Sequence, residues 1–419
     1  MMESRRARQE RARKRSFETR AVHAGEQRPE PQKDPAVPPE SGNGFYPVST
    51  PIYASTTFSH PNIETTDKVL GGEQEGYSYA RYDNPTVVAF EEALASLEGS
   101  GRAFAFASGM AAMHAALVAA DCSSECTVLA ADQLYGSTAT LLVQIFGVGG
   151  VKVRFFDACN PEDLERKLGE LEPRAVVTET ISNPLLRVSD TGQIAALARA
   201  AGSTLIVDNT FGTPYLQRPL ELGADIVVHS ATKYLSGHGD LTAGAVVADP
   251  PYDGAVEQIR KLVGGVLGPF EAWLALRGLK TLPLRIERQC ENAREVAAWL
   301  DSHPKVAKVH HPSLPDHPDG EVVRRVLSDT GGLVALELAS EGREPAFRFL
   351  NALELCVKAP SLGDVYTLAI HPATSSHREL SPSRRERLGV KENLIRLSCG
   401  IEDARDVIQD LQQALDTLQ

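Results

Sequence analysis

The sequence lacks the features that would mark a nucleic-acid-binding or membrane protein. Its 419 residues carry a formal net charge of −12, with 55 acidic against 43 basic side chains. A nucleic-acid surface needs net basic patches, so this balance argues against nucleic acid as a partner. No stretch approaches the roughly 20 uninterrupted apolar residues that cross a bilayer. The best candidate, 111–120, is short and contains His114, which we assign to a helix core, so no membrane span is predicted.

Cysteine is scarce, and no CxxC pair is present. The six cysteines are spread along the chain at Cys122, Cys126, Cys159, Cys290, Cys356 and Cys399. A disulfide framework is not expected in so large a chain, so we predict a reducing, cytoplasmic location. Cys122 and Cys126 are four residues apart, but no second ligand pair accompanies them, and we predict no metal there.

Residues 1–18 stand apart as a predicted disordered basic tail. Residues 4–15 read SRRARQERARKR, without the apolar segment of a secretory signal. A nucleic-acid-binding arm and an organelle presequence are the alternatives to a solvated tail, and Glu3 and Glu10 weigh against the presequence. Residues 28–44 are rich in Pro, Glu and Gly and are typical of extended chain.

From Gly101 onward, short apolar runs alternate with helix-length segments such as 161–170 and 192–201. The runs predict strands at 103–107, 127–131, 151–156, 175–178, 204–207 and 225–228. Short buried strands joined by helices indicate an α/β fold, with a mostly parallel sheet and helices on both faces. In such sheets, ligands bind beyond the carboxyl ends of the strands.

The pattern changes beyond about residue 268. A long helical pattern over 270–300 is broken by Pro283. After it, strands predicted at 306–309, 333–338 and 394–397 alternate with helices predicted at 345–352 and 404–418. This indicates a smaller C-terminal α+β domain. We therefore divide the chain into a tail (1–18), an N-terminal extended segment (19–80), a main domain (81–268) and a C-terminal domain (269–419).

Residues of several kinds, many of them polar, follow the predicted strands at the edge where ligands bind. They are Ser108, Gly109 and Met110 after the first strand, Asp132, Tyr135 and Gly136 after the second, Asn183 and Pro184 after the fourth, Asp208 after the fifth, and Ser230, Ala231, Thr232 and Lys233 after the sixth. One crevice would collect a helix that starts at glycine, a tyrosine, an asparagine, an aspartate, two hydroxyls and a lysine.

Lys233 lies at the centre of this constellation. A lysine that binds a carbonyl cofactor covalently must face a pocket and lose its proton near neutral pH. In SATKYLSGHGD, Lys233 directly follows a strand end, and the hydroxyls of Ser230 and Thr232 precede it by three and one residues. Those hydroxyls suit a cofactor phosphate, as does the helix start at Gly109. Taken alone, Lys233 could be a surface lysine; the surrounding motif favours the site.

Asp208 closes the fifth predicted strand, where an isolated carboxylate could also be a helix cap. Its functional interpretation is a partner for a protonated pyridine nitrogen, since a carboxylate beside a cation favours the charged form of both. The ring would then remain an electron sink for negative charge on a substrate carbon. A lysine 25 residues downstream, at a neighbouring strand end, favours this interpretation over the cap.

From about Thr19 to the C-terminus, the sequence resembles the Cys/Met-metabolism family of fold-type-I pyridoxal-phosphate enzymes. This family includes cystathionine γ-synthases, cystathionine lyases, methionine γ-lyases and O-acylhomoserine sulfhydrylases. The matching stretches are AVHAGE, PIYASTTF, YARYDNPT, ASGMAA, LYGS, DNTFGTPYLQRPLELGADIVVHSATKYLSGHGD, AWLALRGLKTL, IHPATSSH and LIRLSCGIED. The long DNT-to-HGD stretch is highly specific, whereas each short motif is not. The resemblance implies an aminotransferase-like fold and pyridoxal 5′-phosphate as the cofactor.

The resemblance also implies a role for each residue of the crevice. Lys233 would hold the cofactor covalently and remove the substrate Cα proton, and Asp208 would pair with the ring nitrogen. Tyr135 would stack on the ring and take part in catalysis, and Asn183 would bond near the ring hydroxyl and the substrate. The phosphate would be bound by the group Ser108, Gly109, Met110, Ser230 and Thr232. The same resemblance makes VHHPSLPDHP, with His310, His311 and His317, a family loop and not a metal site.

Two further sets of residues are implied by the family. Tyr79 and Arg81 would reach the phosphate from a neighbouring subunit, which residues 19–80 would contact, so the site needs a dimer; tetramers of two dimers are usual. Arg396 would clamp the substrate carboxylate as a planar fork, with Ser361 beside it to orient Lys233. The plainer alternatives are that Tyr135 only packs, Arg81 is a solvated charge and Arg396 pairs with a structural carboxylate.

The reaction is less clearly indicated than the family. Family members that use cystathionine commonly carry a glutamate before the SLG serine; here that residue is Pro360, which offers no charge to a buried ammonium. Methionine γ-lyases usually have an apolar residue there, but typically a cysteine where this chain has Ser137. The segment GDVYTLAIHPATSSH is similar to that of sulfhydrylases. We predict γ-elimination from a sulfur amino acid, with γ-replacement on an O-acylhomoserine as the alternative. An inactive cofactor-binding protein is a remote third, against which Lys233, Asp208 and Arg396 argue.

Overall fold

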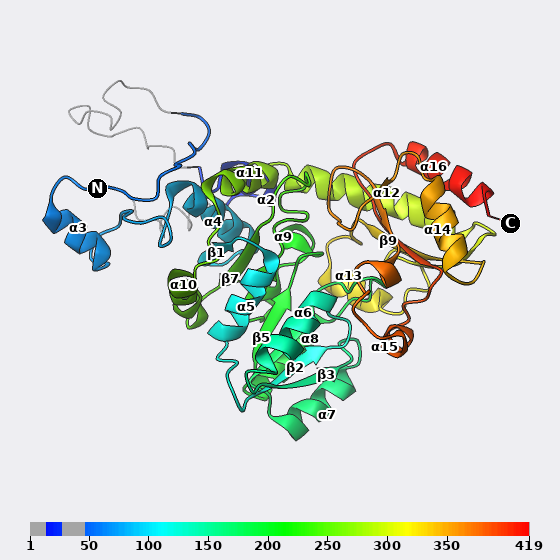
Figure 1. Cartoon of the computed structure of the whole chain (residues 1–419), viewed down its shortest axis with the longest axis horizontal. Coiled ribbons are helices and arrows are strands. Elements are labelled where there is room, and N and C mark those ends of the chain that lie inside the picture. The colour runs from blue at the N-terminus through cyan, green and yellow to red at the C-terminus, as the bar shows by residue number, and fades with distance from the viewer. Residues whose placement is uncertain (1–13, 27–46, 419) are drawn as a thin grey trace.

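The computed structural model describes residues 14–26 and 47–418 of the chain. It contains two sheets, one of seven and one of five strands, each with its own helices (Figure 1). The predicted extended chain at 28–44 and most of the predicted basic tail lie outside the described residues. The predicted domain boundaries stay predictions.

The seven-stranded sheet has the order β1-β7-β6-β5-β4-β2-β3. Its strands are β1 (Arg102–Phe106), β2 (Thr127–Ala131), β3 (Lys152–Phe156), β4 (Ala175–Glu179), β5 (Thr204–Asp208), β6 (Ile226–His229) and β7 (Gly244–Ala248). Only β7 runs antiparallel to its neighbours, so the predicted mostly parallel sheet is confirmed. Strand β7 was not predicted; it returns after β6 without a crossover helix, which is why it pairs antiparallel.

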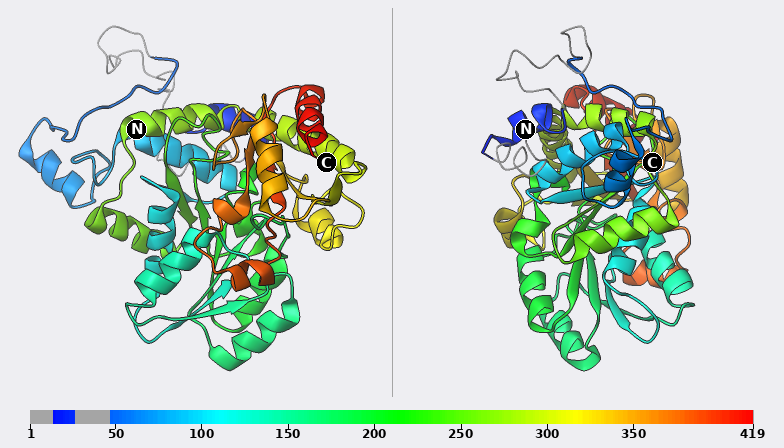
Figure 2. Two further views of the ribbon diagram at one scale, coloured as in Figure 1. Left: turned by 45° about the vertical axis from the view of Figure 1, so that its right-hand side comes forward. Right: turned by 90° about the vertical axis from the view of Figure 1, so that its left-hand side faces the viewer.

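Helices cover both faces of this sheet (Figure 2). They are α4 (Pro85–Glu98), α5 (Gly109–Ala119), α6 (Gly136–Leu141) with its π-helical continuation η1 (Leu142–Phe146), α7 (Pro161–Leu171), α8 (Thr191–Ala200), α9 (Thr213–Leu216), η2 (Pro219–Leu222), α10 (Tyr252–Val263) and α11 (Pro269–Leu279). The central strands have apolar middles, and residues such as Val176, Leu205 and Val227 have no exposed surface. Burial on both faces explains why these strands read as continuous apolar runs.

The five-stranded sheet has the order β10-β11-β12-β9-β8 and forms the smaller α+β unit that the sequence predicted. Its strands are β8 (Val306–His310), β9 (Leu333–Leu338), β10 (Val357–Lys358), β11 (Leu368–Ile370) and β12 (Leu394–Ser398). Its other elements are α13 (Gly320–Val326), α14 (Arg343–Ala352), η3 (Pro372–Thr374), α15 (Pro382–Arg387) and α16 (Ala404–Asp416).

One long helix, α12 (Leu282–Asp301), joins the two units. Its first half contributes Leu282 and Ile286 to the core of the larger unit, and its second half contributes Val296 and Leu300 to the core of the smaller one. The predicted break at Pro283 is confirmed, because α11 ends at Leu279 and Pro283 lies in the first turn of α12. Proline is tolerated there because its missing N–H has no helical partner in any case.

The N-terminal segment leaves the body of the molecule as an arm (Figure 1). Helix α3 (Ile63–Leu70) within it has no buried residue, and Ile63 and Leu70 are 73% and 59% exposed. Helix α2 (Phe17–His23) instead packs on α4 and α12. It begins inside the segment predicted as tail, because Ser16 caps it by accepting a hydrogen bond from the Thr19 N–H. Among the described helices, none is long and apolar enough to cross a membrane.

Candidate active site

The carboxyl ends of β4, β5 and β6 bring most of the predicted constellation together. Asp208 is the last residue of β5 and lies in register with Glu179, the last residue of β4. His229 ends β6, and Ser230 to Lys233 follow it directly. This edge of a parallel sheet is where ligands bind in α/β proteins.

Lys233 faces the small unit across the crevice. Its Nζ donates a hydrogen bond to Oγ of Ser361 at 2.9 Å. Burial lowers the pKa of the Lys233 ammonium, and the positive charge of Arg396 lowers it further. Both causes disfavour the charged form, so the neutral amine becomes available at a lower pH than in a free lysine. This is the condition that nucleophilic and general-base chemistry requires.

Arg396, on β12, is a buried cation without an anionic partner. One guanidinium nitrogen donates to Oδ1 of Asn183 at 2.8 Å, and another donates to the backbone oxygen of Ser361 at 2.9 Å. Among the described residues, Arg396 forms no ion pair, and its buried Nε has no hydrogen-bond partner. Burial lowers its pKa to about 10, which leaves it charged at neutral pH. A buried cation is costly unless it is paired, so this fork fits a substrate carboxylate.

Asp208 accepts two hydrogen bonds from one residue. The backbone N–H of Thr210 lies 3.0 Å and its hydroxyl 2.5 Å from Oδ1 of Asp208. Burial raises the pKa of Asp208, while the two bonds from Thr210 and the nearby His229 oppose that rise. Asp208 does not cap helix α9, which begins at Thr213 with Gly212 at the cap position.

Glu179 is a site residue that the sequence analysis missed. Its Oε1 accepts a hydrogen bond of 2.5 Å from the backbone N–H of Tyr135. Burial, and then the charge of Asp208, raise the pKa of Glu179 well above its usual range. The fourth strand was predicted to end at Thr178, one residue short of Glu179. Treating the next residue as the strand end would have found it.

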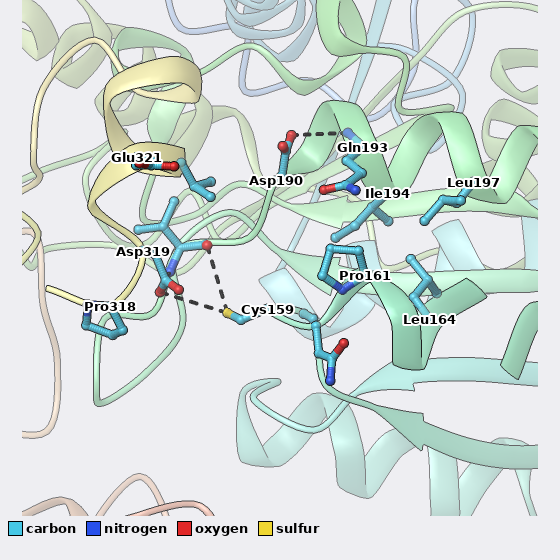
Figure 3. A pocket seen from close by; sticks show the side chains of 14 residues that line it. Cys159, Pro161, Leu164, Asp190, Gln193, Ile194, Leu197, Pro318, Asp319 and Glu321 are labelled. Carbon is cyan, nitrogen blue, oxygen red and sulfur yellow. Dashed lines mark hydrogen bonds between the residues drawn. The ribbon is translucent and has the colours of Figure 1, made fainter. Parts of the chain in front are cut away.

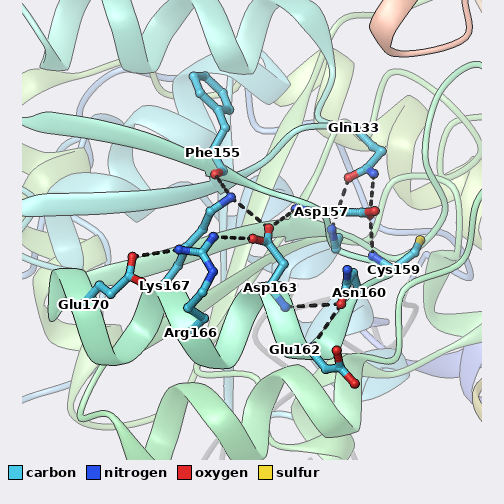
Figure 4. Close-up of polar contacts among 11 residues, drawn as sticks. Gln133, Phe155, Asp157, Cys159, Asn160, Glu162, Asp163, Arg166, Lys167 and Glu170 are labelled. Carbon is cyan, nitrogen blue, oxygen red and sulfur yellow. Dashed lines mark hydrogen bonds and ion pairs between the residues drawn. The ribbon is translucent and has the colours of Figure 1, made fainter.

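The loop that carries Tyr135 is held from two sides. Glu179 binds the Tyr135 backbone, and the side chain of Gln133 donates to Asp157 at 2.8 Å and accepts from the Ala158 N–H at 3.3 Å (Figure 4). The Tyr135 side chain is 40% exposed at the start of α6. The loop therefore presents an aromatic ring to the crevice from a fixed backbone.

A cradle for an anion lies at the start of α5. Ser108 caps this 11-residue helix, accepting the Ala111 N–H at 3.1 Å, so Gly109 and Met110 supply its first two amides. A Cβ added at Gly109 would lie 2.8 Å from Cβ and 3.0 Å from Oγ of Ser230. The Ser230 hydroxyl therefore lies beside free helical amides, which is an arrangement that fits a phosphate.

Thr232 and the pair Tyr79 and Arg81 are placed differently from the rest. The Thr232 hydroxyl accepts the Ala243 N–H at 2.9 Å and donates to the Ala243 oxygen at 3.1 Å, so it is engaged with backbone. Arg81 donates to the Lys261 oxygen at the end of α10, and its guanidinium lies 5.6 Å from the Tyr79 ring centroid. None of these contacts involves the Lys233 crevice. The predicted role of Tyr79 and Arg81 in a neighbour's site stays a prediction.

A separate cavity of about 260 Å³ lies between α7, α8 and the start of α13 (Figure 3). Cys159 faces it, 3.9 Å from Asp319, and burial raises the pKa of this thiol to about 12. Asp319 is paired with Arg187, so neither group is an available nucleophile or anion. None of the predicted site residues lines this cavity.

The histidines of the VHHPSLPDHP loop have structural partners. His310 lies 2.8 Å from Glu337, and His317 lies 3.2 Å from the Leu186 oxygen. Within residues 14–26 and 47–418, no three His, Cys, Asp or Glu side chains are grouped as metal ligands.

Comparison with known proteins identifies the family to which this set of site residues belongs. The family model described as Cys/Met metabolism PLP-dependent enzyme matches residues 19–416. The chain belongs to this family. Its members use pyridoxal 5′-phosphate, and the Gly109 and Ser230 cradle, Asp208 and Lys233 fit the phosphate, ring nitrogen and carbonyl carbon of that cofactor. The protein is therefore a pyridoxal-phosphate-dependent C–S lyase or γ-replacement enzyme.

Relatives in the family carry several names. The chain is 41% identical over 401 residues to the L-methionine gamma-lyase of Pseudomonas putida, covering 95% of this chain and 97% of the relative. It is 40% identical over 372 residues to the cystathionine gamma-lyase of Bacillus subtilis, covering 88% and 95%. A cystathionine gamma synthase structure from Xanthomonas oryzae pv. oryzae matches with a TM-score of 0.87 and 34% identity, covering 96% and 98%. This likeness confirms the predicted fold.

Proposed function

We propose that the protein catalyses γ-elimination from a sulfur amino acid such as methionine, homocysteine or cystathionine. The observation that supports this most directly is the unpaired fork of Arg396, which shares Ser361 with the Lys233 amine. A bound α-carboxylate on Arg396 would place the neighbouring Cα near Nζ of Lys233. The names of the relatives favour elimination over exchange, since the two lyases are 41% and 40% identical to this chain and the cystathionine gamma synthase is 34% identical.

Each residue of the crevice receives a role in this proposal. When bound, the cofactor supplies an electron sink for negative charge at the substrate Cα. Lys233 would hold it covalently and move the Cα proton, and Ser361 would orient the amine. Asp208 would keep the ring nitrogen protonated, because a carboxylate beside it favours the cation. Tyr135 would cover the ring and supply a proton to the leaving group.

The remaining residues would bind the substrate or the cofactor. Arg396 and Asn183 hold the substrate carboxylate, and Asn183 also reaches the ring oxygen. The phosphate would be bound by the α5 cradle and the turn after β6 through Ser108, Gly109, Met110 and Ser230. Thr232 would join them only by releasing its hydrogen bond to the Ala243 oxygen. Tyr79 and Arg81 complete the phosphate site of a neighbouring subunit.

We propose a homotetramer, built as a dimer of dimers, in the cytoplasm. The arm supports the assembly, because α3 buries none of its residues within its own chain and exposes Ile63 and Leu70. Exposed apolar side chains on an extended arm are typical of a surface that another chain covers. All six cysteines are free, which supports a reducing compartment.

γ-Replacement on an O-acylhomoserine is the second candidate, supported by the likeness to a cystathionine gamma synthase. A product assay separates the two. We expect purified enzyme to release a 2-oxo acid and ammonia from methionine or homocysteine without an added thiol, and the Lys233→Ala variant to release neither. Formation of cystathionine or homocysteine only when O-acylhomoserine is combined with cysteine or sulfide would favour replacement.

Pro360 bears on which substrate the enzyme prefers, because it is exposed and directly precedes Ser361 in the chain. Cystathionine carries a distal ammonium, and removing this ammonium from water without an anionic partner costs several kcal/mol. We expect kcat/KM to be higher for methionine than for cystathionine, and Pro360→Glu to shift this ratio towards cystathionine. Using a ratio of two substrates in one variant cancels general damage to the loop. Strong wild-type preference for cystathionine would show that another acidic residue binds the ammonium.

A further inference from the structure

Two carboxylic acids end neighbouring strands of the crevice at the same level. Glu179 and Asp208 are register partners in the parallel pair β4 and β5. Strands lie about 4.8 Å apart in a sheet, and side chains at one level of a parallel pair point to the same side. The charge of Asp208 acts on Glu179 directly, so the two groups form one electrostatic unit. Two partly buried carboxylates that act on each other do not both ionise at low cost, so a proton on one of them stabilises the pair.

The surroundings of the two groups decide which one stays charged. Asp208 accepts two hydrogen bonds from Thr210, and His229 at the end of β6 adds a favourable interaction with its negative form. His229 is itself anchored, with Nε2 lying 2.6 Å from Glu98. Among residues 14–26 and 47–418, Glu179 accepts only the N–H of Tyr135, and no cation there offsets its burial. The donors therefore favour the ionised form of Asp208 over that of Glu179.

We propose that Glu179 carries the proton of this pair and is a positioning residue for the cofactor site. As a neutral carboxyl it holds the backbone of Tyr135, and with it the ring that covers the cofactor. Because it is uncharged, Asp208 remains the single negative charge at the ring nitrogen. This inference rests on the proposed role of Asp208, which the experiment below tests separately.

The substitution Glu179→Gln separates a neutral from a charged Glu179. Glutamine keeps an oxygen that accepts the Tyr135 N–H but carries no charge. The pH midpoint of the bound cofactor's visible absorbance should therefore stay within about 0.3 pH units of wild type, and the cofactor Kd within about threefold. Glu179→Ala removes the acceptor of the Tyr135 N–H, loosens the loop that carries the ring, and should weaken cofactor binding to the apoprotein by about tenfold.

Two further variants make the result decisive. Asp208→Asn should shift the midpoint by about one pH unit or more, since the cofactor loses the anion beside its ring nitrogen. Asp410→Asn changes a buried carboxylate on α16, outside the crevice, that also accepts backbone N–H groups, and it should leave the midpoint unchanged. Infrared spectra of the apoprotein at neutral pH should show a protonated-carboxyl band that Glu179→Gln lacks.

A midpoint shift in Glu179→Gln that matches the shift in Asp208→Asn would overturn the proposal, because it would mean that Glu179 is ionised. An infrared band of undiminished intensity in Glu179→Gln would do the same. If instead Asp208→Asn leaves the midpoint unmoved while the band still disappears in Glu179→Gln, the proton assignment stands and the role of Asp208 fails.

Discussion

His377 shows how one buried, uncharged side chain leaves Arg396 as the cation that would bind a substrate carboxylate. It is 3% exposed, and its Nδ1 lies 2.9 Å from the Ser376 hydroxyl. Burial, and then the charge of Arg396, lower the pKa of His377 to about 4. The imidazole is therefore neutral at pH 7, and Arg396 remains the cation of the proposed carboxylate site.

The lowered pKa of His377 predicts that the stability of the folded protein depends on pH. Its pKa is lower in the folded chain than the ordinary value of 6.5, so the unfolded chain binds the proton first as the pH falls. Stability from this residue is complete above pH 6.5 and is lost towards pH 4, with about 2 kcal/mol lost between pH 7 and pH 5. Urea unfolding should show that His377→Gln loses less stability over this range than wild type.

The control for this prediction is His23→Gln, because His23 is exposed on α2. That variant should follow the wild-type pH dependence. An unchanged pH dependence in His377→Gln would mean that His377 titrates alike in the folded and unfolded chain, and that Arg396 does not act on it.

At the scale of elements, the strands that the sequence predicted are those long enough to carry a pattern. All six strands predicted in the larger unit lie within one residue of their observed ends, because continuous apolar runs mark burial on both faces. Strands β10 and β11, of two and three residues, were missed because they are too short for any periodicity. Strand β7 was missed because it breaks the alternation of strand and helix on which the interpretation relied.

The same limits apply to the site. Residues that directly follow strands, such as Asp208 and Lys233, could be predicted because the carboxyl ends of parallel strands converge. Arg396 and Ser361 come from the other unit, and only the family resemblance pointed to them. The partners that tune these groups, such as Thr210 beside Asp208, depend on side-chain geometry that no sequence spacing reveals.

The start of α5 gives a prediction about how closely this helix packs against the Ser230 turn. Alanine at Gly109 would place Cβ 2.8 Å from Cβ of Ser230, so either the helix start or the Ser230 turn must move. We expect Gly109→Ala to weaken cofactor affinity by about tenfold or more, measured by titrating the apoprotein with the cofactor. The matched control is Gly169→Ala on α7, where an added Cβ meets nothing within 4 Å.

Gly169→Ala should leave cofactor affinity unchanged and raise the free energy of unfolding by about 0.5–1 kcal/mol, because alanine favours a helix over glycine. Wild-type cofactor affinity in Gly109→Ala would show that the phosphate does not bind against the start of α5.

At the scale of the whole molecule, two of the predicted site residues, Tyr79 and Arg81, make their observed contacts outside the Lys233 crevice of their own chain. Tyr79 and Arg81 lie on the arm, beside the Lys261 oxygen and away from Lys233. The family resemblance assigns both to the phosphate of a neighbouring site. If that is so, Arg81 and Lys233 of one chain serve two different sites, and damage to one can be compensated by another chain.

Mixing two inactive chains tests this arrangement. In a mixed dimer of Arg81→Ala and Lys233→Ala chains, the site built on the Arg81→Ala chain has its own Lys233 and receives an intact Arg81 from its partner. Half of randomly formed dimers are mixed and one of their two sites is intact, so activity should recover to about a quarter of wild type. The control mixes Lys233→Ala with Arg396→Ala, two residues of the same crevice, and should recover nothing. Co-purification of two differently tagged chains proves the mixing. No recovery in such doubly tagged Arg81→Ala and Lys233→Ala oligomers would assign Arg81 to its own subunit's site or to none.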